Sequence, residues 1–303
     1  MRLRNIDLLK GLLILLVIVG HVVREEMSHS LLRTFIYSFH MPLFVAISGF
    51  LYHLSPDSRV VDLMKKYTVR LLLPWASAVL IYYLATDAYR VGDSWGTSLV
   101  DAFLYPYYHL WFIPAYLSWV ALTWLMRRLG LSHRQILWAG IGISVVATIL
   151  QQALPLQGVP GKLFYTFRPY LYLYFVVGLW YRHHPVRRTL RTEYIWPVIC
   201  SVVVVYLYVH PLPMMSLWVN LLFSLSLIHL LLNLALGYQL PHCRQLEWLG
   251  THSLTFYLWH VLPILCATAF IPNIHSPLFY IVTIALELVL VGFYSLYIKQ
   301  KTT

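Results

Sequence analysis

The chain has little charge. Only 11% of its 303 residues are Asp, Glu, Lys or Arg, whereas a soluble domain carries roughly 25%. Fifty consecutive residues, 194–243, contain none of these four types, and neither do the thirty-nine residues 248–286. A helix that crosses a membrane needs about 20 mostly apolar residues, so each stretch is long enough for two crossings. The lack of charge therefore excludes a soluble protein.

What fills the chain instead is apolar: 60% of the residues are hydrophobic. We expect an all-α polytopic membrane protein, folded as a single transmembrane domain over residues 1–303. Pro211 and Pro213 divide the first uncharged stretch, and Pro272 and Pro277 divide the second, as turn residues do. Hydropathy and its interruptions predict ten transmembrane helices, near residues 6–24, 35–54, 67–87, 107–127, 134–153, 166–183, 194–210, 214–237, 252–271 and 277–298.

The formal net charge is +11. A basic soluble protein would suggest a nucleic-acid partner, but no basic cluster here lies in a soluble segment, so we expect none. A membrane protein instead collects Lys and Arg in its cytoplasmic loops. With the N-terminus inside, 17 of the 22 Lys and Arg residues fall on the inner side, which predicts that both termini are cytoplasmic. The five on the outer side are Arg24, Arg33, Arg90, Lys162 and Arg168.

Two ionisable residues lie on one face of the first helix. Ionisable side chains are costly inside a membrane, so each suggests a function. Lys10 and His21 are eleven positions apart, which places them within about 20° of one face and roughly 16 Å apart along the axis. Lys10 could equally extend to the cytoplasmic boundary, and His21 could be an ordinary bundle histidine. The spacing alone leaves both interpretations open.

Three further histidines, His40, His109 and His260, are expected in the outer half with His21. No two of them share a spacing typical of metal ligands, so we expect no metal. The aromatic residues around His109, including Trp111, fit an interfacial aromatic belt. They fit a surface that packs against sugar rings as well.

Charged residues elsewhere suggest ligands for phosphate. Arg70 is expected to lie deeper than Lys65 and Lys66 and could bind a phosphate with its planar set of donors. Arg168, at the outer end of a helix, could do the same for an acceptor. Glu287 is the only carboxylate deep within a helix, so it is expected to face the bundle and to have a partner there. Its role is open.

Five segments in this order resemble the acyltransferase 3 family of integral membrane O-acyltransferases, in particular its fucose 4-O-acetylase-like branch. A basic residue, ten intervening positions and a histidine mark that family's first helix, and Lys10 and His21 match them. The resemblance spans the whole chain. The segments are Ile6–Gly11 with Val19–His21, Phe39–Phe44 with Ser48–Phe50, Arg70 before Pro74, His109–Phe112, and Gly250–His260.

The resemblance implies an enzyme of a bacterial inner membrane that takes acetyl from cytoplasmic acetyl-CoA. The acceptor would be a hydroxyl of a carbohydrate, either a surface polysaccharide or a lipid-linked sugar. His21 and Lys10 would be catalytic, His21 as general base, although a covalent acetyl-histidine stays open. Lys10 and Arg70 would bind the phosphates of CoA. The acceptor would contact His40, His109, Trp111, Arg168 and His260.

Other functions remain open on sequence alone. A transporter or flippase of a lipid-linked sugar, without acyl transfer, would also have many helices and a polar interior. Such a protein is expected to contain inverted repeats or broken helices in corresponding positions, and neither is evident. A non-catalytic component of a polysaccharide assembly complex is a third hypothesis. The sequence leaves open whether the chain forms a homo-oligomer in the bilayer.

Overall fold

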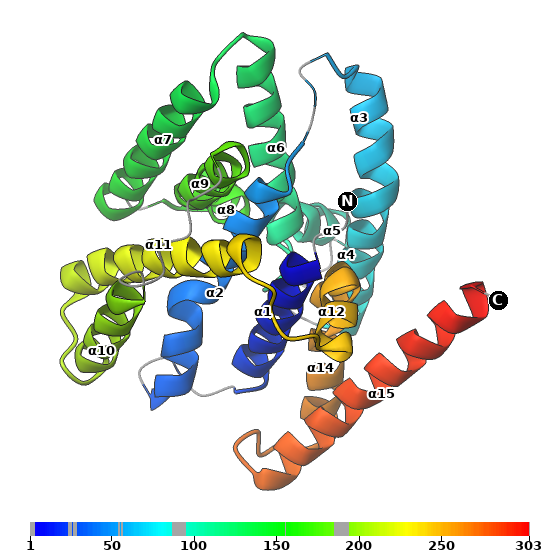
Figure 1. The fold of residues 1–303 in the computed structure, drawn as a ribbon. Coiled ribbons are helices and arrows are strands. Elements are labelled where there is room, and N and C mark those ends of the chain that lie inside the picture. The colour runs from blue at the N-terminus through cyan, green and yellow to red at the C-terminus, as the bar shows by residue number, and fades with distance from the viewer. Residues whose placement is uncertain are drawn as a thin grey trace. The chain divides into compact units, whose positions relative to one another are not determined.

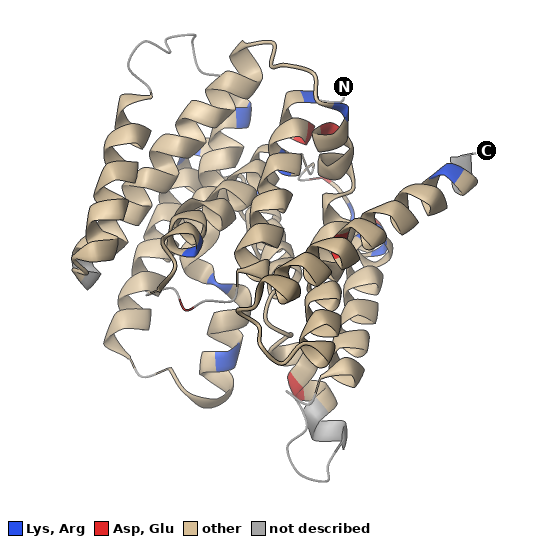
Figure 2. Ribbon diagram, turned by 90° about the horizontal axis from the view of Figure 1, so that it is seen from below, with Lys and Arg blue, Asp and Glu red and all other residues tan. Residues whose placement is uncertain are grey.

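The computed structural model describes residues 4–23, 26, 29–53, 55, 57–86, 95–154, 156–184 and 194–302, and all regular structure in these residues is helical (Figure 1). Charged residues are sparse along the ribbon (Figure 2). Six arginines that contributed to the charge bias lie outside the described residues: Arg2, Arg24, Arg90, Arg187, Arg188 and Arg191.

The helices coincide with the predicted segments. In chain order the matching helices are α1 (Arg4–Val22), α2 (Leu31–Phe50), α4 (Leu73–Ala85), α6 (Phe112–Arg128), α7 (His133–Ala153), α9 (Tyr172–His183), α10 (Ile195–Val209), α11 (Pro213–Gly237), α14 (Val261–Phe270) and α15 (Pro277–Thr302). The shorter elements are α3 (Val60–Tyr67), the π-helix η2 (Thr68–Leu72), α5 (Trp95–Leu104), α8 (Gly158–Phe167), the 3₁₀-helix η4 (Pro169–Leu171), α12 (Arg244–Thr251) and α13 (Ser253–Trp259).

Seven helices of the described chain are long and apolar enough to cross a membrane by length and composition. The prediction of an all-α multi-pass membrane protein is therefore confirmed. Helices α6, α9 and α10 have 17, 12 and 15 residues, fewer than the roughly 20 that a crossing takes. The count of ten crossings stays a prediction.

One predicted helix, 166–183, is broken near its start. Helix α8 ends at Phe167, Arg168 is left-handed, and η4 precedes α9. Pro169 follows the break and has no N–H to donate to a carbonyl of the preceding turn, which favours a break at this position. Four short helices lie mostly outside the predicted segments: α3, α5, α8 and α12. They have only 8 to 10 residues and are too short to stand out in a hydropathy pattern.

The chain packs as two compact units. Unit 1 consists of Met1–Met41 and Arg188–Thr303, and unit 2 of Pro42–Arg187. Helix α2 therefore begins in unit 1 and continues in unit 2 from Pro42, the proline inside it. The prediction of a single domain over the whole chain stays a prediction.

In unit 1, α1 packs most extensively against α12. Two glycines allow this close approach. A Cβ at Gly11 would overlap the backbone carbonyl of Leu246, and a Cβ at Gly250 would overlap the carbonyl of Asp7. Small residues serve in this way where membrane helices pack backbone to backbone.

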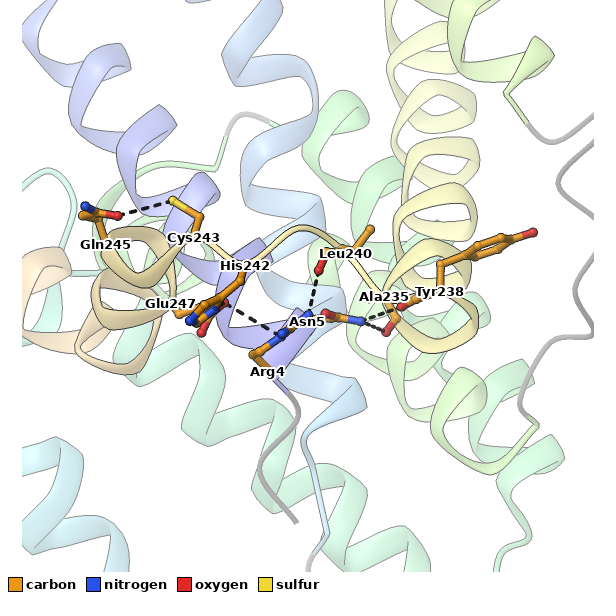
Figure 3. Close-up of polar contacts among 9 residues, drawn as sticks. All are labelled: Arg4, Asn5, Ala235, Tyr238, Leu240, His242, Cys243, Gln245 and Glu247. Atoms are coloured by element: carbon orange, nitrogen blue, oxygen red, sulfur yellow. Dashed lines mark hydrogen bonds and ion pairs between the residues drawn. The ribbon is translucent and has the colours of Figure 1, made fainter.

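Polar side chains at the start of α1 tie it to the end of α11 and the start of α12 (Figure 3). Asn5 Nδ2 donates to the carbonyls of Ala235 and Tyr238, each at 2.8 Å. Arg4 Nη2 donates to the carbonyl of Leu240 at 2.6 Å and lies 3.8 Å from Glu247. These bonds satisfy carbonyls at and just beyond a helix C-terminus, which have no partner within the helix.

Unit 2 contains a second close crossing, between α9 and the second half of α2. A Cβ at Gly49 would overlap the carbonyl of Phe175, and a Cβ at Gly178 would overlap the carbonyl of Ala46. The ring of Phe175 is fully buried, and aromatic rings of α6 lie against it, with the centroids of Tyr116 and Trp119 at 6.2 and 6.3 Å. The crossing therefore holds the aromatic core of this unit.

Gly250→Ala should destabilise the protein, because its methyl group would overlap the Asp7 carbonyl and overpacking typically costs about 1–3 kcal/mol. Gly292→Ala is the matched control, since a Cβ there meets nothing within 4 Å. Alanine is the better helix former by about 1 kcal/mol, so the control should unfold at the same or a higher temperature. Thermal unfolding of the detergent-solubilised protein measures both, and equal melting temperatures for the two variants would contradict the close crossing.

Candidate active site

Lys10 lies on α1 beside an acid that the sequence analysis overlooked. Its Nζ is 3.0 Å from Oδ1 of Asp7, and the two side chains are only 18% and 12% exposed. Beyond Arg4 at its start, the exposed residues of α1 are apolar: Leu12, Leu15 and Val19. The cation therefore lies inside the protein rather than toward lipid, with its charge partly balanced. An acid three positions before a lysine in a helix was the signal available in the sequence.

His21, eleven residues further along α1, lies in a cluster of rings within unit 1. Its ring centroid is 5.0 Å from that of His260 and 6.0 Å from that of Tyr37. The hydroxyl of Tyr37 is 3.3 Å from Nδ1 of His21. The centroid of the His40 ring is 4.8 Å from that of Tyr37. The predicted residues His21, His40 and His260 thus come together, around a tyrosine that was not predicted.

Backbone contacts fix the tautomers of two of these histidines. Nδ1 of His40 is 2.7 Å from the carbonyl of Ile36, and Nδ1 of His260 is 2.9 and 3.0 Å from the carbonyls of Phe256 and Tyr257. A carbonyl only accepts hydrogen bonds, so each Nδ1 carries the proton and each Nε2 has the lone pair. Both side chains are buried. His260 occupies the break between α13 and α14, where helix geometry brings these carbonyls to its ring.

In unit 2 the predicted residues Trp111 and Arg168 are in contact. The guanidinium carbon of Arg168 lies 3.9 Å from the centroid of the Trp111 ring. Arg168 Nε donates to the carbonyl of Tyr165 at 3.1 Å, and Nη1 donates to the hydroxyl of Tyr170 at 3.4 Å. These contacts use two of the five N–H donors of the guanidinium. The guanidinium of Arg168 is therefore held against the face of the Trp111 ring. Its other N–H groups have no hydrogen-bond partner among the described residues and could bind a ligand.

Backbone strain occurs beside two predicted residues. Arg168 has φ 42° and Tyr108, which precedes His109, has φ 29°; they are the non-glycine residues of the described chain with positive φ. Such conformations cost about 1–3 kcal/mol each and tend to occur at functional sites. His109 itself is buried, and its ring centroid is 5.1 Å from that of Tyr82. One strained residue thus directly precedes His109, and the other is Arg168 itself.

Arg70 differs from the prediction. It lies in the π-helix η2, which precedes Pro74, and it is exposed rather than deep in the protein. A π-helical turn is rare and often marks a functional site. The expected burial of Arg70 is wrong: its side chain is exposed, within a stretch, Val60–Ala85, that is long and apolar enough to cross a membrane.

Glu287 faces the protein interior, as expected, but the expected partner is not found. It is 7% exposed, and neither carboxylate oxygen has a hydrogen-bond partner among the described residues. Thr283, one helical turn earlier on α15, is fully buried and its hydroxyl also lacks a partner there. A buried polar group without a hydrogen-bond partner lowers the free energy of unfolding by about 1–3 kcal/mol.

The described residues hold no group of three or more His, Cys, Asp or Glu side chains that could bind a metal ion. Unit 1 instead offers a buried lysine near the start of α1 and several imidazoles near its end. Such a set of groups suits proton transfer and the binding of an anion.

Fold and site together define a multi-pass membrane protein with imidazoles clustered at one end of its first helix. The sequence pattern of an acyltransferase domain matches residues 3–298. The chain belongs to the acyltransferase 3 family, and the protein is a membrane acyltransferase. This membership favours an enzyme over the transporter hypothesis. Searches of curated proteins and of solved structures returned no match.

Asp7→Ala should lower the free energy of unfolding by about 3 kcal/mol, because it leaves Lys10 largely buried without its carboxylate. The double variant Asp7→Ala/Lys10→Met should recover most of that loss, since no uncompensated charge remains. The exposed pair of Arg59 and Asp62 is the control, and Asp62→Ala should cost less than about 1 kcal/mol. Chemical unfolding in mixed micelles measures each value. A double variant as unstable as Asp7→Ala would show that the ion pair is not the cause.

Glu287→Met should raise the melting temperature, because it removes two buried oxygen atoms that have no partner among the described residues. Glu247→Met is the control: Glu247 lies 2.7 Å from His242 and 3.8 Å from Arg4, so its replacement should lower the melting temperature. A Glu287→Met protein that melts lower than the parent would show that the carboxyl group has a stabilising partner.

Proposed function

We propose that the protein is an O-acetyltransferase that moves the acetyl group of cytoplasmic acetyl-CoA to a hydroxyl of a carbohydrate. The acceptor is a surface polysaccharide or a lipid-linked sugar, and the membrane is the inner membrane of a bacterium. The observation that carries the proposal is the arrangement along α1. Lys10 and His21 are about 16 Å apart at 1.5 Å per residue, and the imidazole of His260 and the hydroxyl of Tyr37 lie beside the His21 ring.

His21 acts as the general base. Its imidazole takes the proton of the acceptor hydroxyl as the oxygen attacks the thioester carbonyl. The bond between carbon and sulfur then breaks, and the CoA thiolate takes up the proton that the His21 imidazolium gives back. His21 is only partly buried, so a hydroxyl can reach it, whereas its neighbour His260 and the more distant His40 are buried.

Cations bind the donor. In unit 1, Lys10 binds a phosphate of CoA and also counts as catalytic, because it orients the donor toward His21. The carboxylate of Asp7 balances the positive charge of Lys10 when the donor is not bound. In unit 2, Arg70 is proposed separately as a phosphate-binding residue.

Aromatic and imidazole groups bind the acceptor. The contact of Arg168 with Trp111 supports an acceptor site, because the buried Trp111 ring holds the guanidinium, whose N–H groups can donate to the oxygens of a sugar. His40, His109 and His260 contribute the remaining acceptor contacts. No metal takes part in this reaction, and lipid surrounds the helices.

His21→Ala should abolish transfer of labelled acetyl from acetyl-CoA to a panel of methyl glycosides, with a loss of at least about 100-fold, as expected for a general base. The assay uses the whole chain in lipid nanodiscs. His275→Ala, which changes an exposed loop histidine of the same unit, should keep full activity. A His21→Ala protein that is correctly folded and still transfers acetyl would rule out His21 as the base.

Lys10→Gln distinguishes the donor site from the base. It should raise the KM for acetyl-CoA about tenfold or more while changing kcat less, because a charge-assisted hydrogen bond to phosphate contributes roughly 1.5–3 kcal/mol. An unchanged KM for acetyl-CoA would mean that Lys10 does not bind the donor.

A further inference from the structure

A side-chain hydroxyl lies beside one nitrogen of the His21 ring, Nδ1. Nδ1 lies 3.3 Å from the hydroxyl oxygen of Tyr37, on the first half of α2. A neutral imidazole carries one proton, and the contact at one nitrogen decides which nitrogen keeps the lone pair. The tautomer of His21 therefore depends on the direction of its hydrogen bond with Tyr37.

We propose that Tyr37 is a positioning residue whose oxygen accepts the proton of His21 Nδ1, so that Nε2 presents its lone pair to the acceptor hydroxyl. This inference rests on the proposed role of His21 as the base. In the opposite direction the Tyr37 hydroxyl would donate to Nδ1, and Nε2 would carry the proton and could not act as a base. After proton transfer the imidazolium still donates through Nδ1, so the same contact stabilises both states.

The neighbouring histidines follow the same pattern. His40 and His260 each direct Nδ1 toward backbone carbonyls, so Nε2 is the acceptor nitrogen in both. His21 has the Tyr37 hydroxyl at the same ring position, where those two histidines have carbonyls. An oxygen at Nδ1 is thus common to all three rings in unit 1.

Tyr37 is held where this contact requires it. The guanidinium carbon of Arg33, one turn earlier on α2, lies 5.2 Å from the centroid of the Tyr37 ring. The centroid of the His40 ring, three residues later, lies 4.8 Å from the same centroid. Gly20, directly before His21, makes room for the ring. A Cβ at Gly20 would lie 2.9 Å from Cε2 of Tyr37. The absence of a side chain at residue 20 therefore lets the tyrosine approach the imidazole.

Nitrogen-15 NMR of the whole chain, labelled at histidine and held in lipid nanodiscs, tests the proposal. The His21 signals are identified by their loss in His21→Gln. The parent should show His21 with its proton on Nδ1, and Tyr37→Phe should shift the population toward the Nε2–H form. Tyr37→Phe should also lower kcat about tenfold or more, a part of the general-base contribution, with the KM for acetyl-CoA unchanged.

Gly20→Ala is a second variant that leaves the hydroxyl in the protein but displaces the ring, and it should change the tautomer in the same direction. Gly292→Ala, where a Cβ meets nothing within 4 Å, and Tyr297→Phe, at a half-exposed ring, should leave both tautomer and kcat unchanged. A parent protein with the His21 proton on Nε2 would overturn the inference, as would a Tyr37→Phe protein with unaltered tautomer and kcat. The NMR result is independent of acetyl transfer, so a failure of the proposed function would be recognised separately.

Discussion

The arrangement of unit 1 depends on the contact of two backbones at the crossing of α1 and α12. Between membrane helices there is little hydrophobic driving force, because lipid is as apolar as the side chains, and close packing of small residues has to replace it. Gly11 and Gly250 provide this packing reciprocally, each facing a carbonyl of the other helix. One of those carbonyls belongs to Asp7, whose carboxylate contacts Lys10. The helix crossing and the charged pair therefore share a residue, and the position of the cation follows from the packing.

At the other end of α1, the proposed base His21 differs from His40 and His260 in the group that contacts its Nδ1. In apolar surroundings a hydrogen bond is stronger than in water, and a polar group without one is costly. Backbone carbonyls at His40 and His260 are a rigid way to fix a tautomer, because they belong to the helices themselves. At His21 the partner is a side chain, which can adjust as the ring gains and loses a proton. This difference is consistent with a single base among three adjacent imidazoles.

Much of the fold could be predicted from sequence because charge and apolar length decide it. The uncharged stretches 194–243 and 248–286 identify membrane helices without any knowledge of packing. The break at Arg168 was missed, since Pro169 also fits the first turn of a helix and hydropathy does not distinguish the two. The exposure of Arg70 was missed because a π-helical turn leaves no trace in an apolar pattern.

The relative positions of site residues on one helix could be predicted from their spacing in the sequence. Contacts between residues of two different helices could not. Lys10 and His21 share one helix, so a count of residues places them. The approach of Tyr37 to His21 depends on the packing of α2 against α1 and on the space left by Gly20. Glu287 shows the same limit: its burial follows from its apolar surroundings in sequence, while its lack of a hydrogen-bond partner in the described chain depends on every neighbouring side chain.

The π-helix η2 has a consequence for how this part of the chain can vary. A π-helical turn corresponds to one residue more than an α-helical turn holds. Loss of a single residue within Thr68–Leu72 would convert the turn to an α-helix and join α3 to α4 without interruption. Because the wide turn already accommodates the extra residue, Lys65 and Lys66 would keep nearly the same direction relative to α4. The chain can therefore gain or lose one residue here while the helices on both sides keep the faces that they present.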